Sequence, residues 1–376
     1  MSAQIKEEII SEIETFKEEQ IEFLQELVRT PSVNPYVKNP TKSNPKKPVE
    51  LEVAKLIFNK LKKFGLSPRF EGISSLRPNV VCEFGEGKKT LIFNGHMDTV
   101  PPTRDYDFDP FSGVIKEGKL YGVGVLDMKS ALSCYVYAAR ALLKFEKELK
   151  GKICLQFVID EEPMAASHFG TRYLLEKGYT GDAAIIGEPG TRKITIGNRG
   201  GYRFKIEVFG DAVHTGSREW EQKKKGKNAI LEMTKVINSL QDFKFPAEQH
   251  PVFPGRKNVL TFPTLITGGK AINVVPDSCV AFGDTRILPG ITKEFMEKEI
   301  KKRIDKLEVK YKLTPVVYVP SVFIKPEEKI VKILKDNTLQ ILKKEPIVEG
   351  SGPWSDMWMF IDKGIPAVNF GCDGDA

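Results

Sequence analysis

Two kinds of hydrophobic pattern divide this chain. Up to about residue 197, short apolar runs alternate with amphipathic stretches of helical spacing. Strands and helices that take turns in this way are typical of a mostly parallel α/β sheet. The apolar runs predict strands at 80–84, 90–93, 152–158 and 183–186. The helical spacing predicts helices at 5–29, 50–64, 129–146 and 170–177.

Near residue 198 the pattern changes to a clean alternation of apolar and polar residues. It predicts strands at 202–209, 258–266, 279–286 and 311–319, and helices at 226–240 and 291–307. The order β-α-β-β-α-β is that of a ferredoxin-like α+β sheet covered by two helices. A helix at 327–342 and a strand at 365–370 then return to the first pattern. We therefore expect an α/β domain over 1–197 and 323–376, interrupted by an inserted α+β domain over 198–322.

Composition narrows the class of protein. The chain has 376 residues, 41% of them hydrophobic and 28% charged, which is typical of a globular protein of about two domains. The five cysteines are far apart and form no CxxC pair, which favours free thiols in a reducing cytoplasm. There is neither an apolar signal core at the N-terminus nor a run of roughly 18 apolar residues. We therefore expect a cytoplasmic protein without a membrane partner.

The net charge of +7 is spread over the whole chain rather than gathered in one segment. Its basic clusters are flanked by acids or turn residues, and no aromatic residues are interleaved for base stacking. Solvated surface explains them better than nucleic-acid binding.

A histidine and several acids stand at the ends of predicted strands. His96 and Asp98 follow the strand at 90–93, and side chains two residues apart in a strand point to the same side. The carboxylate of Asp98 could therefore hold the far ring nitrogen of a metal-binding His96. Taken alone, the pair fits a structural histidine better. Asp127 stands at a glycine-rich turn before a helix, where it could bridge two cations or cap the helix.

Further acids follow the next two strands. Asp160, Glu161 and Glu162 come directly after the strand at 152–158, and Glu188 follows the strand at 183–186. Like charges so close together repel, so the cluster needs either cations or full solvation. One glutamate could bind metal while its neighbour takes a proton from an activated water. Imidazole and carboxylate ligands together suit zinc, and also cobalt or manganese.

Seven segments occur in a fixed order from residue 94 to the C-terminus. They are NGHMDTVPP, GVGVLDMKS, DEEPMAASHFG, IIGEP, VHTGSREWEQKKKGKNAI, GGKAINVVPDSCVAFGDTR and SGPWSDMW…GIPAVNFG. As an ordered set they resemble the dinuclear zinc deacylases and exopeptidases. That family includes acetylornithine deacetylase, succinyl-diaminopimelate desuccinylase, aminoacylase and glutamate carboxypeptidase. The resemblance implies a metallohydrolase catalytic domain with an inserted lid that often also forms a dimer.

The resemblance assigns metal-binding roles to individual residues. It implies that His96 and Glu188 hold one zinc and that Asp127 bridges it to a second. Glu162 is then a ligand of the second zinc, and Asp98 orients His96.

The same resemblance assigns roles toward the substrate. It implies that Glu161 is the general base and that His214, in the lid, reaches the oxyanion of the substrate, commonly in the partner subunit. Such a donor stabilises charge that develops in the transition state. Asn273 and Arg286 match substrate-carboxylate contacts, and so does the loop that begins at Ser351.

Two positions depart from the pattern of this family. The turn before Asp127 reads Gly-Val-Gly where the family usually has Gly-Arg-Gly. The second zinc of the family takes a histidine shortly after a segment like Asn369–Ala376, and the printed chain ends without one. Either the chain is a truncated form of a longer active protein, or it is a catalytically impaired homologue.

The expected function is a metal-dependent hydrolase that forms a homodimer through its lid. It would cleave the amide bond of an N-acyl amino acid, as a deacetylase or desuccinylase does, or of a small peptide, by a metal-activated water. The alternative is an impaired homologue that binds a small molecule or a partner protein.

Overall fold

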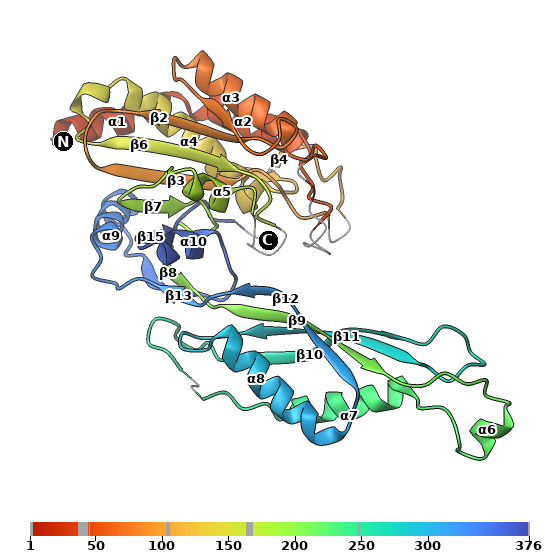
Figure 1. Ribbon diagram of the computed structural model, residues 1–376. Helices are drawn as coiled ribbons and strands as arrows, with labels where there is room; N and C mark the ends of the chain where they lie inside the picture. Colours follow the sequence, from red (N-terminus) through yellow and green to blue (C-terminus); the bar gives the residue numbers. More distant parts are fainter. Residues whose placement is uncertain are drawn as a thin grey trace. The chain divides into compact units, whose positions relative to one another are not determined.

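The computed structural model describes residues 3–36, 44, 46–102, 106–162, 168–246 and 249–374. Residues 163–167 of the DEEPMAASHFG segment and the last two residues of the chain lie outside this range. The chain divides into two compact units, one formed by Met1–Asn198 with Phe323–Ala376 and the other by Arg199–Val322 (Figure 1). Over the described residues, no helix is both long and apolar enough to cross a membrane.

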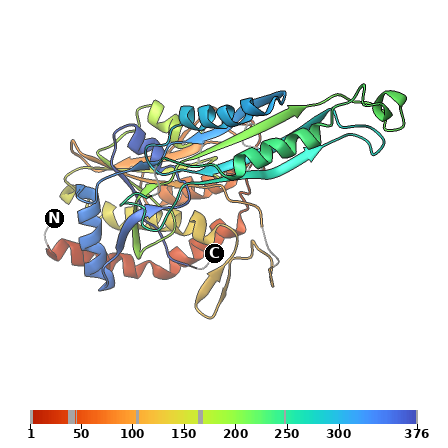
Figure 2. The same ribbon diagram turned by 90° about the horizontal axis from the view of Figure 1, so that it is seen from below.

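A nine-stranded sheet forms the centre of the first unit. In spatial order its strands are β1 (Arg69–Glu71), β2 (Asn79–Phe84), β6 (Lys152–Val158), β3 (Thr90–His96), β7 (Ala183–Ile186), β15 (Ala367–Asn369), β8 (Lys193–Asn198) and β13 (Val322–Phe323), and β14 (Ile347–Ser351) pairs with β8. The pairs β3–β6, β3–β7, β7–β15 and β8–β14 are parallel. The predicted mostly parallel α/β sheet is therefore confirmed. The hairpin of β4 (Val114–Lys116) and β5 (Lys119–Tyr121) stands apart from this sheet (Figure 2).

The helices of this unit fall into two groups. One group consists of α1 (Ala3–Thr15), α2 (Lys17–Arg29), α3 (Leu51–Lys63) and α4 (Ser130–Leu143), which pack together and against β2 and β3. The other consists of α9 (Lys329–Leu342) and α10 (Met357–Asp362), which between them contact β7, β8 and β15, and of α5 (Thr171–Glu176), which packs against α10. Their apolar faces close the core on the sheet because buried apolar area is what holds such layers together.

The single helix predicted over 5–29 is two helices in the structure. They meet at Phe16, whose backbone leaves the helical region at φ −98° and ψ 0°. The break turns the Phe16 ring into the core beside Tyr137, at 6.2 Å between ring centroids. Periodicity did not reveal the break because both helices keep apolar residues at helical spacing.

The second unit is an antiparallel sheet with helices on one face. Its strands run in the order β10 (Val259–Gly268), β11 (Ser278–Arg286), β9 (Gly201–Phe209) and β12 (Tyr311–Val319). The helices α7 (Ala229–Gln241) and α8 (Lys293–Ile304) lie side by side along the sheet, and the short α6 (Arg218–Glu221) lies in a connection (Figure 1). The order of elements is the predicted β-α-β-β-α-β order. Strict alternation in β9 and β11 buries one side of each strand against these helices.

Some elements carry too weak a pattern to be predicted from the sequence. These are β1, β8, β13, β14, α10 and the β4–β5 hairpin. Most of them are short, and short strands gain their stability from the neighbours with which they pair. The strand predicted at 90–93 also continues to His96, because residues 94–96 pair with the end of β6.

Candidate metal centre

The carboxyl ends of three neighbouring parallel strands build the candidate site. Strand β3 lies between β6 and β7, with His96 paired to Val158 and Asn94 paired to Ile186. Polar residues that follow these strands therefore meet at the same edge of the sheet. In this way residues that are about 90 positions apart in the sequence, such as His96 and Glu188, become neighbours.

Three of the predicted ligands come together at this edge. The Nε2 atom of His96 lies 3.0 Å from Oδ1 of Asp127 and 4.0 Å from Oε1 of Glu188. One donor atom from each residue lies within 4.8 Å of the others. His96 is buried, Glu188 is largely buried and Asp127 is half exposed, so the group opens to solvent on the Asp127 side.

Glycines allow the backbones that carry these ligands to approach closely. Gly124 has a φ of 78°, and a Cβ at this position would lie 2.4 Å from a methyl group of Thr99. At Gly187 a Cβ would lie 2.5 Å from Cβ of Ala131, at the start of α4. Neither position accepts a larger residue without displacing its neighbour. The turns that place Asp127 and Glu188 therefore require glycine.

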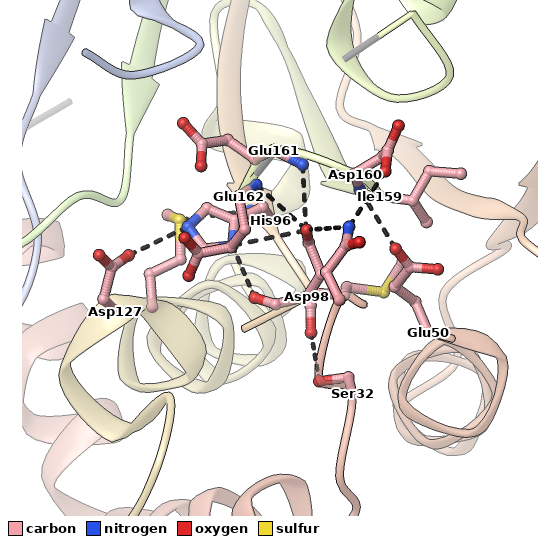
Figure 3. Close-up of polar contacts among 12 residues, drawn as sticks. Ser32, Glu50, His96, Asp98, Asp127, Ile159, Asp160, Glu161 and Glu162 are labelled. Atoms are coloured by element: carbon pink, nitrogen blue, oxygen red, sulfur yellow. Dashed lines mark hydrogen bonds and ion pairs between the residues drawn. The ribbon is translucent and has the colours of Figure 1, made fainter. Parts of the chain in front are cut away.

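Asp98 does two different things with its main chain and its side chain. Nδ1 of His96 lies 2.9 Å from the backbone carbonyl oxygen of Asp98 and 3.7 Å from its carboxylate (Figure 3). The carbonyl therefore makes the hydrogen bond that orients the ring, and leaves Nε2 free for the metal side. The carboxylate accepts backbone N–H groups from Glu161 and Glu162, both at 3.1 Å. Asp98 thus ties the His96 strand end to the acidic turn after β6.

Burial and mutual repulsion dominate the electrostatics of these acids. Burial raises the pKa of Glu161 and Glu188 well above the usual range of a carboxyl group. Burial, followed by the charges of Asp127 and Asp98, raises the pKa of Glu162 to about 8 despite the opposing effect of His96. Cations bound among these groups would reverse the effect, because positive charge favours the ionised carboxylate. The donor set therefore fits a metal ion.

Burial acts in the opposite direction on His96. It disfavours the charged imidazolium, but the hydrogen bond with Asp127 and the charges of the surrounding acids outweigh it and raise the pKa of His96. An acidic surrounding of this kind accepts positive charge, whether from a protonated ring or from a metal ion.

The second predicted metal position is less complete than the first. Glu162 accepts the backbone N–H of Val100 at 3.0 Å. Within the ranges that the structure describes, His96, Asp127 and Glu188 are the His, Cys, Asp or Glu side chains whose donor atoms lie close enough together to share a metal ion. In those same ranges, no third donor of these residue types forms such a group with Asp127 and Glu162.

Three predicted substrate contacts belong to the second unit. His214 and Asn273 lie together there, with 3.3 Å between Nε2 of the histidine and Nδ2 of the asparagine, and both side chains are exposed. Arg286 lies elsewhere, on β11, where its guanidinium pairs with Asp284 at 2.9 Å. The structure therefore brings two of these three residues together.

The loop after β14 contains one expected and one unexpected residue. The Ser351 hydroxyl donates a hydrogen bond to the backbone of Pro353 at 3.0 Å. Asp356, at the start of α10, is buried and accepts a hydrogen bond from the Thr171 hydroxyl at 2.5 Å. Burial raises the pKa of Asp356 to about 6. Asp356 is a further acid beside those predicted for the site. Its place in the SGPWSDMW segment was the only signal for it in the sequence.

Comparison with known proteins agrees with this geometry. Residues 92–376 match peptidase family M20/M25/M40. The fold is similar to that of the M20 metallo-carboxypeptidase Sso-CP2 from Sulfolobus solfataricus, with a TM-score of 0.74 and 18% identity over 94% of this chain and 91% of that one. It is equally similar to the dipeptidase Dug1p from Saccharomyces cerevisiae, with a TM-score of 0.74 and 16% identity over 99% and 92% of the two chains.

A third solved structure has a similar fold. The YXEP protein of Bacillus subtilis, described as a dinuclear metal-binding peptidase of the M20 family, has a TM-score of 0.67 and 17% identity over 96% of this chain and 89% of that one. The resemblance seen in the sequence motifs is thus confirmed. This chain belongs to peptidase family M20/M25/M40 and is a metal-dependent peptidase or amidohydrolase.

Proposed function

We propose that this protein hydrolyses the amide bond of a small peptide or an N-acyl amino acid at the His96–Asp127–Glu188 site. The observation that carries the proposal is the convergence of these three donors beside the buried Glu161, at the carboxyl ends of β3, β6 and β7. Several proteins of similar fold carry the names of dipeptidases or tripeptidases, which supports small peptides as substrates.

Metal ions at this site would polarise the amide carbonyl and lower the pKa of a water molecule. The remaining tasks fall to the chain itself. His96, Asp127 and Glu188 would hold zinc, cobalt or manganese, and Glu162 with Asp127 would serve a second ion. Glu161 would accept a proton from the water and return it to the leaving amine, which requires a carboxylate within hydrogen-bond reach of both. Its burial strengthens such a transfer, because little water screens the charges.

The test is an activity screen over dipeptides, tripeptides and N-acyl amino acids with zinc, cobalt and manganese. Glu161→Gln keeps the size of the side chain and removes its basicity. We expect kcat to fall by roughly 10²- to 10⁴-fold while the metal content stays unchanged. Glu176→Gln, on the exposed side of α5, is the matched control and should leave both quantities unchanged. Full activity of Glu161→Gln would remove Glu161 from the mechanism.

The same experiment separates the enzyme from an impaired homologue. A chain that binds one metal tightly and hydrolyses none of the amides would favour a binding protein. We keep this second candidate because the described residues contain one group of three metal ligands rather than two such groups.

We further propose that the second unit forms the homodimer and supplies His214 to the reaction. Two features of this unit support a dimer. Strand β10 lies at the edge of the sheet, and its residues Leu265 and Ile266 are 61% and 45% exposed. On α7, Leu231 is 58% exposed. An unpaired edge strand with apolar side chains favours pairing with another strand.

The hydrogen bonds of His214 suit an oxyanion donor. Its Nδ1 accepts the backbone N–H of Gly216 at 3.1 Å, which favours a proton on Nε2. In that tautomer the Asn273 amide, 3.3 Å from Nε2, turns its oxygen rather than its nitrogen toward the ring. Asn273 and Arg286 would then contact the carboxylate of the substrate, as would the Ser351 loop.

Mixing two inactive variants tests this arrangement. We expect Glu161→Gln and His214→Ala dimers each to lose most activity. If His214 acts across the dimer, subunit exchange between them should restore about a quarter of wild-type activity, because half of the dimers are mixed and each holds one intact site. Light scattering on the double variant Leu231→Glu, Leu265→Lys should show a monomer. A wild-type monomer would exclude the dimer.

A further inference from the structure

A fully buried ion pair lies behind the metal-binding edge of the sheet. Arg77 and Glu50 both have side chains that are 0% exposed. Nε of Arg77 donates to Oε2 of Glu50 at 2.7 Å, and its terminal nitrogen donates to Oε1, so the pair is bidentate. A buried ion pair contributes little net stability, because the desolvation of both charges offsets their attraction. Its role is therefore better sought in what the pair holds.

The ion pair holds Asp160, the first residue after β6, by its side chain and by its main chain. The guanidinium of Arg77 donates to Oδ1 of Asp160 at 3.1 Å. The backbone N–H of Asp160 donates to Oε1 of Glu50 at 3.2 Å (Figure 3). Asp160 has a φ of 64°, in the left-handed region that non-glycine residues occupy at a cost. The contacts from Arg77 and Glu50 offset that cost.

A third side chain connects this pair to the metal-binding residues. Nδ2 of Asn34 donates to Oδ1 of Asp160 at 3.0 Å and to Oδ2 of Asp98 at 2.9 Å. The carboxylate of Asp98 in turn accepts the backbone N–H groups of Glu161 and Glu162. An unbroken chain of hydrogen bonds therefore runs from Arg77 to the turn that carries both glutamates.

We propose that Arg77, with Glu50 and Asn34, forms a buried brace that positions Glu161 and Glu162 for the reaction. The proposal rests on the function proposed above for those two glutamates. The left-handed turn at Asp160 decides in which direction the next two side chains leave the strand end, and the brace fixes that turn from behind. Arg77 touches neither substrate nor metal ligand directly, so it is a positioning residue rather than a catalytic one.

Charge and geometry both suit this role. Arg77 is surrounded by the carboxylates of Glu50 and Asp160, with Asp98 one side chain further away. The planar guanidinium satisfies two acids at once in a fixed geometry, which a lysine ammonium cannot reproduce. Partners of this kind behind metal ligands commonly change metal affinity or activity by 10- to 100-fold when they are removed.

The test compares three variants of the full chain. Arg77→Met removes the charge and the guanidinium but keeps an unbranched side chain in place of the aliphatic part of arginine, and Arg77→Lys keeps the charge without the bidentate geometry. Leu61→Ala, in the buried face of α3, is the control for lost stability, because it lies in the same unit outside the brace. Each variant is measured for unfolding in urea, for kcat and KM on the best peptide substrate, and for Co²⁺ affinity by competition with a chelator.

We expect Arg77→Met to lower kcat per folded molecule by 10- to 100-fold, to leave KM within about threefold, and to weaken Co²⁺ binding by a similar factor of 10 to 100. Arg77→Lys should recover part of both losses. Leu61→Ala should lose stability while kcat and Co²⁺ affinity stay at the wild-type values. If Arg77→Met behaves like Leu61→Ala, the ion pair is merely structural and the brace is excluded.

Two further measurements cover the cases in which Arg77→Met does not fold or the wild-type chain is inactive. If Arg77→Met fails to fold, Glu50→Gln combined with Arg77→Met removes both charges together and should restore folding but not kcat or Co²⁺ affinity. If the wild-type chain cleaves no amide, the proposed function fails, and the Co²⁺ affinities of wild type and Arg77→Met still decide whether the brace positions the site.

Discussion

The acids of the metal site and the acids of the second unit have opposite surroundings. In the second unit, Asp277 meets Lys270, which lowers the pKa of that carboxyl group. Partial burial raises the pKa of Glu232, but hydrogen bonds from Lys235 and Lys227 lower it more. At the metal site of the first unit, burial raises the pKa of Glu161, Glu162 and Glu188. The basic side chain that opposes this rise is the shared His96 rather than a lysine or an arginine.

The difference shows which positive charges compensate the acids in each place. The acids of the second unit are neutralised by the fold itself, so they contribute modestly to its stability. The acids of the metal site are held together at a cost that a bound cation would offset. A fold that keeps such a cluster sacrifices stability for binding, as active sites commonly do.

Removal of metal should destabilise the first unit alone. Metal at 100 times its Kd stabilises the folded state by about 2.7 kcal/mol, and a chelator removes that contribution. Hydrogen exchange measured by mass spectrometry should therefore speed up in peptides from β3, β6 and β7 after chelation. Peptides from β9 and β11 serve as the internal control. Equal acceleration in both units would show that the metal is not confined to the predicted site.

In the chelated protein, the metal site and the second unit should respond to pH with opposite signs. The pKa of Glu162 is raised to about 8, so its stabilising contribution is complete below pH 4.5 and is lost as the pH rises toward 8. The slope is about 1.4 kcal/mol per pH unit for each proton. Glu232 has a lowered pKa, so its contribution is present above pH 4.5 and is lost on acidification. Hydrogen exchange at pH 7.5 and pH 5, corrected for the intrinsic exchange rate, would measure the Glu162 effect, and a further point at pH 3.5 would measure the Glu232 effect. A change of the same sign over both intervals would contradict the prediction.

Neutralising one acid of the metal site should stabilise the protein when metal is absent. Glu188→Gln removes a buried charge from the cluster, and we expect a gain on the order of 1 kcal/mol in urea unfolding with a chelator present. With metal present the same variant should lose metal and activity. A loss of stability under both conditions would mean that the Glu188 carboxylate is compensated within the fold.

The equivalent change in the second unit should have a small effect of the opposite sign. Glu232→Gln removes a partner of Lys227 and Lys235 at 3.3 and 2.7 Å. We expect a loss of roughly 0.5 kcal/mol in urea, with or without metal, because both lysine partners are about half exposed, at 46% and 53%, and solvent screens their charges. Any dependence of this loss on metal would link the two units.

Much of the fold was predictable because its patterns are local. Strands 152–158, 183–186 and 311–319 coincide with β6, β7 and β12, whose apolar runs are bounded by turn residues. The break at Phe16 and the short strands β8 and β14 were missed, since each is decided by what lies beside it in space. The mostly parallel sheet and the family are confirmed. The roles of individual site residues remain predictions.

Local patterns in the sequence were enough to single out the candidate residues for the chemistry. His96, Asp127, Glu161, Glu162 and Glu188 stand out because each ends an apolar strand or occupies a glycine-rich turn, and local spacing is enough to show this. Their order along the chain was also enough to reveal the family. Such information is local, and a linear pattern records it.

Only the tertiary structure decided how those residues are held. Asn34, Glu50 and Arg77 have ordinary neighbours in the sequence and carry no motif. They surround Asp160 because α3, the segment before β2 and the end of β6 meet behind the site. The structure also shows that the backbone carbonyl of Asp98 orients the His96 ring. The carboxylate of Asp98 instead accepts hydrogen bonds from the acidic turn after β6. Contacts between distant segments depend on packing in three dimensions, which no local pattern contains.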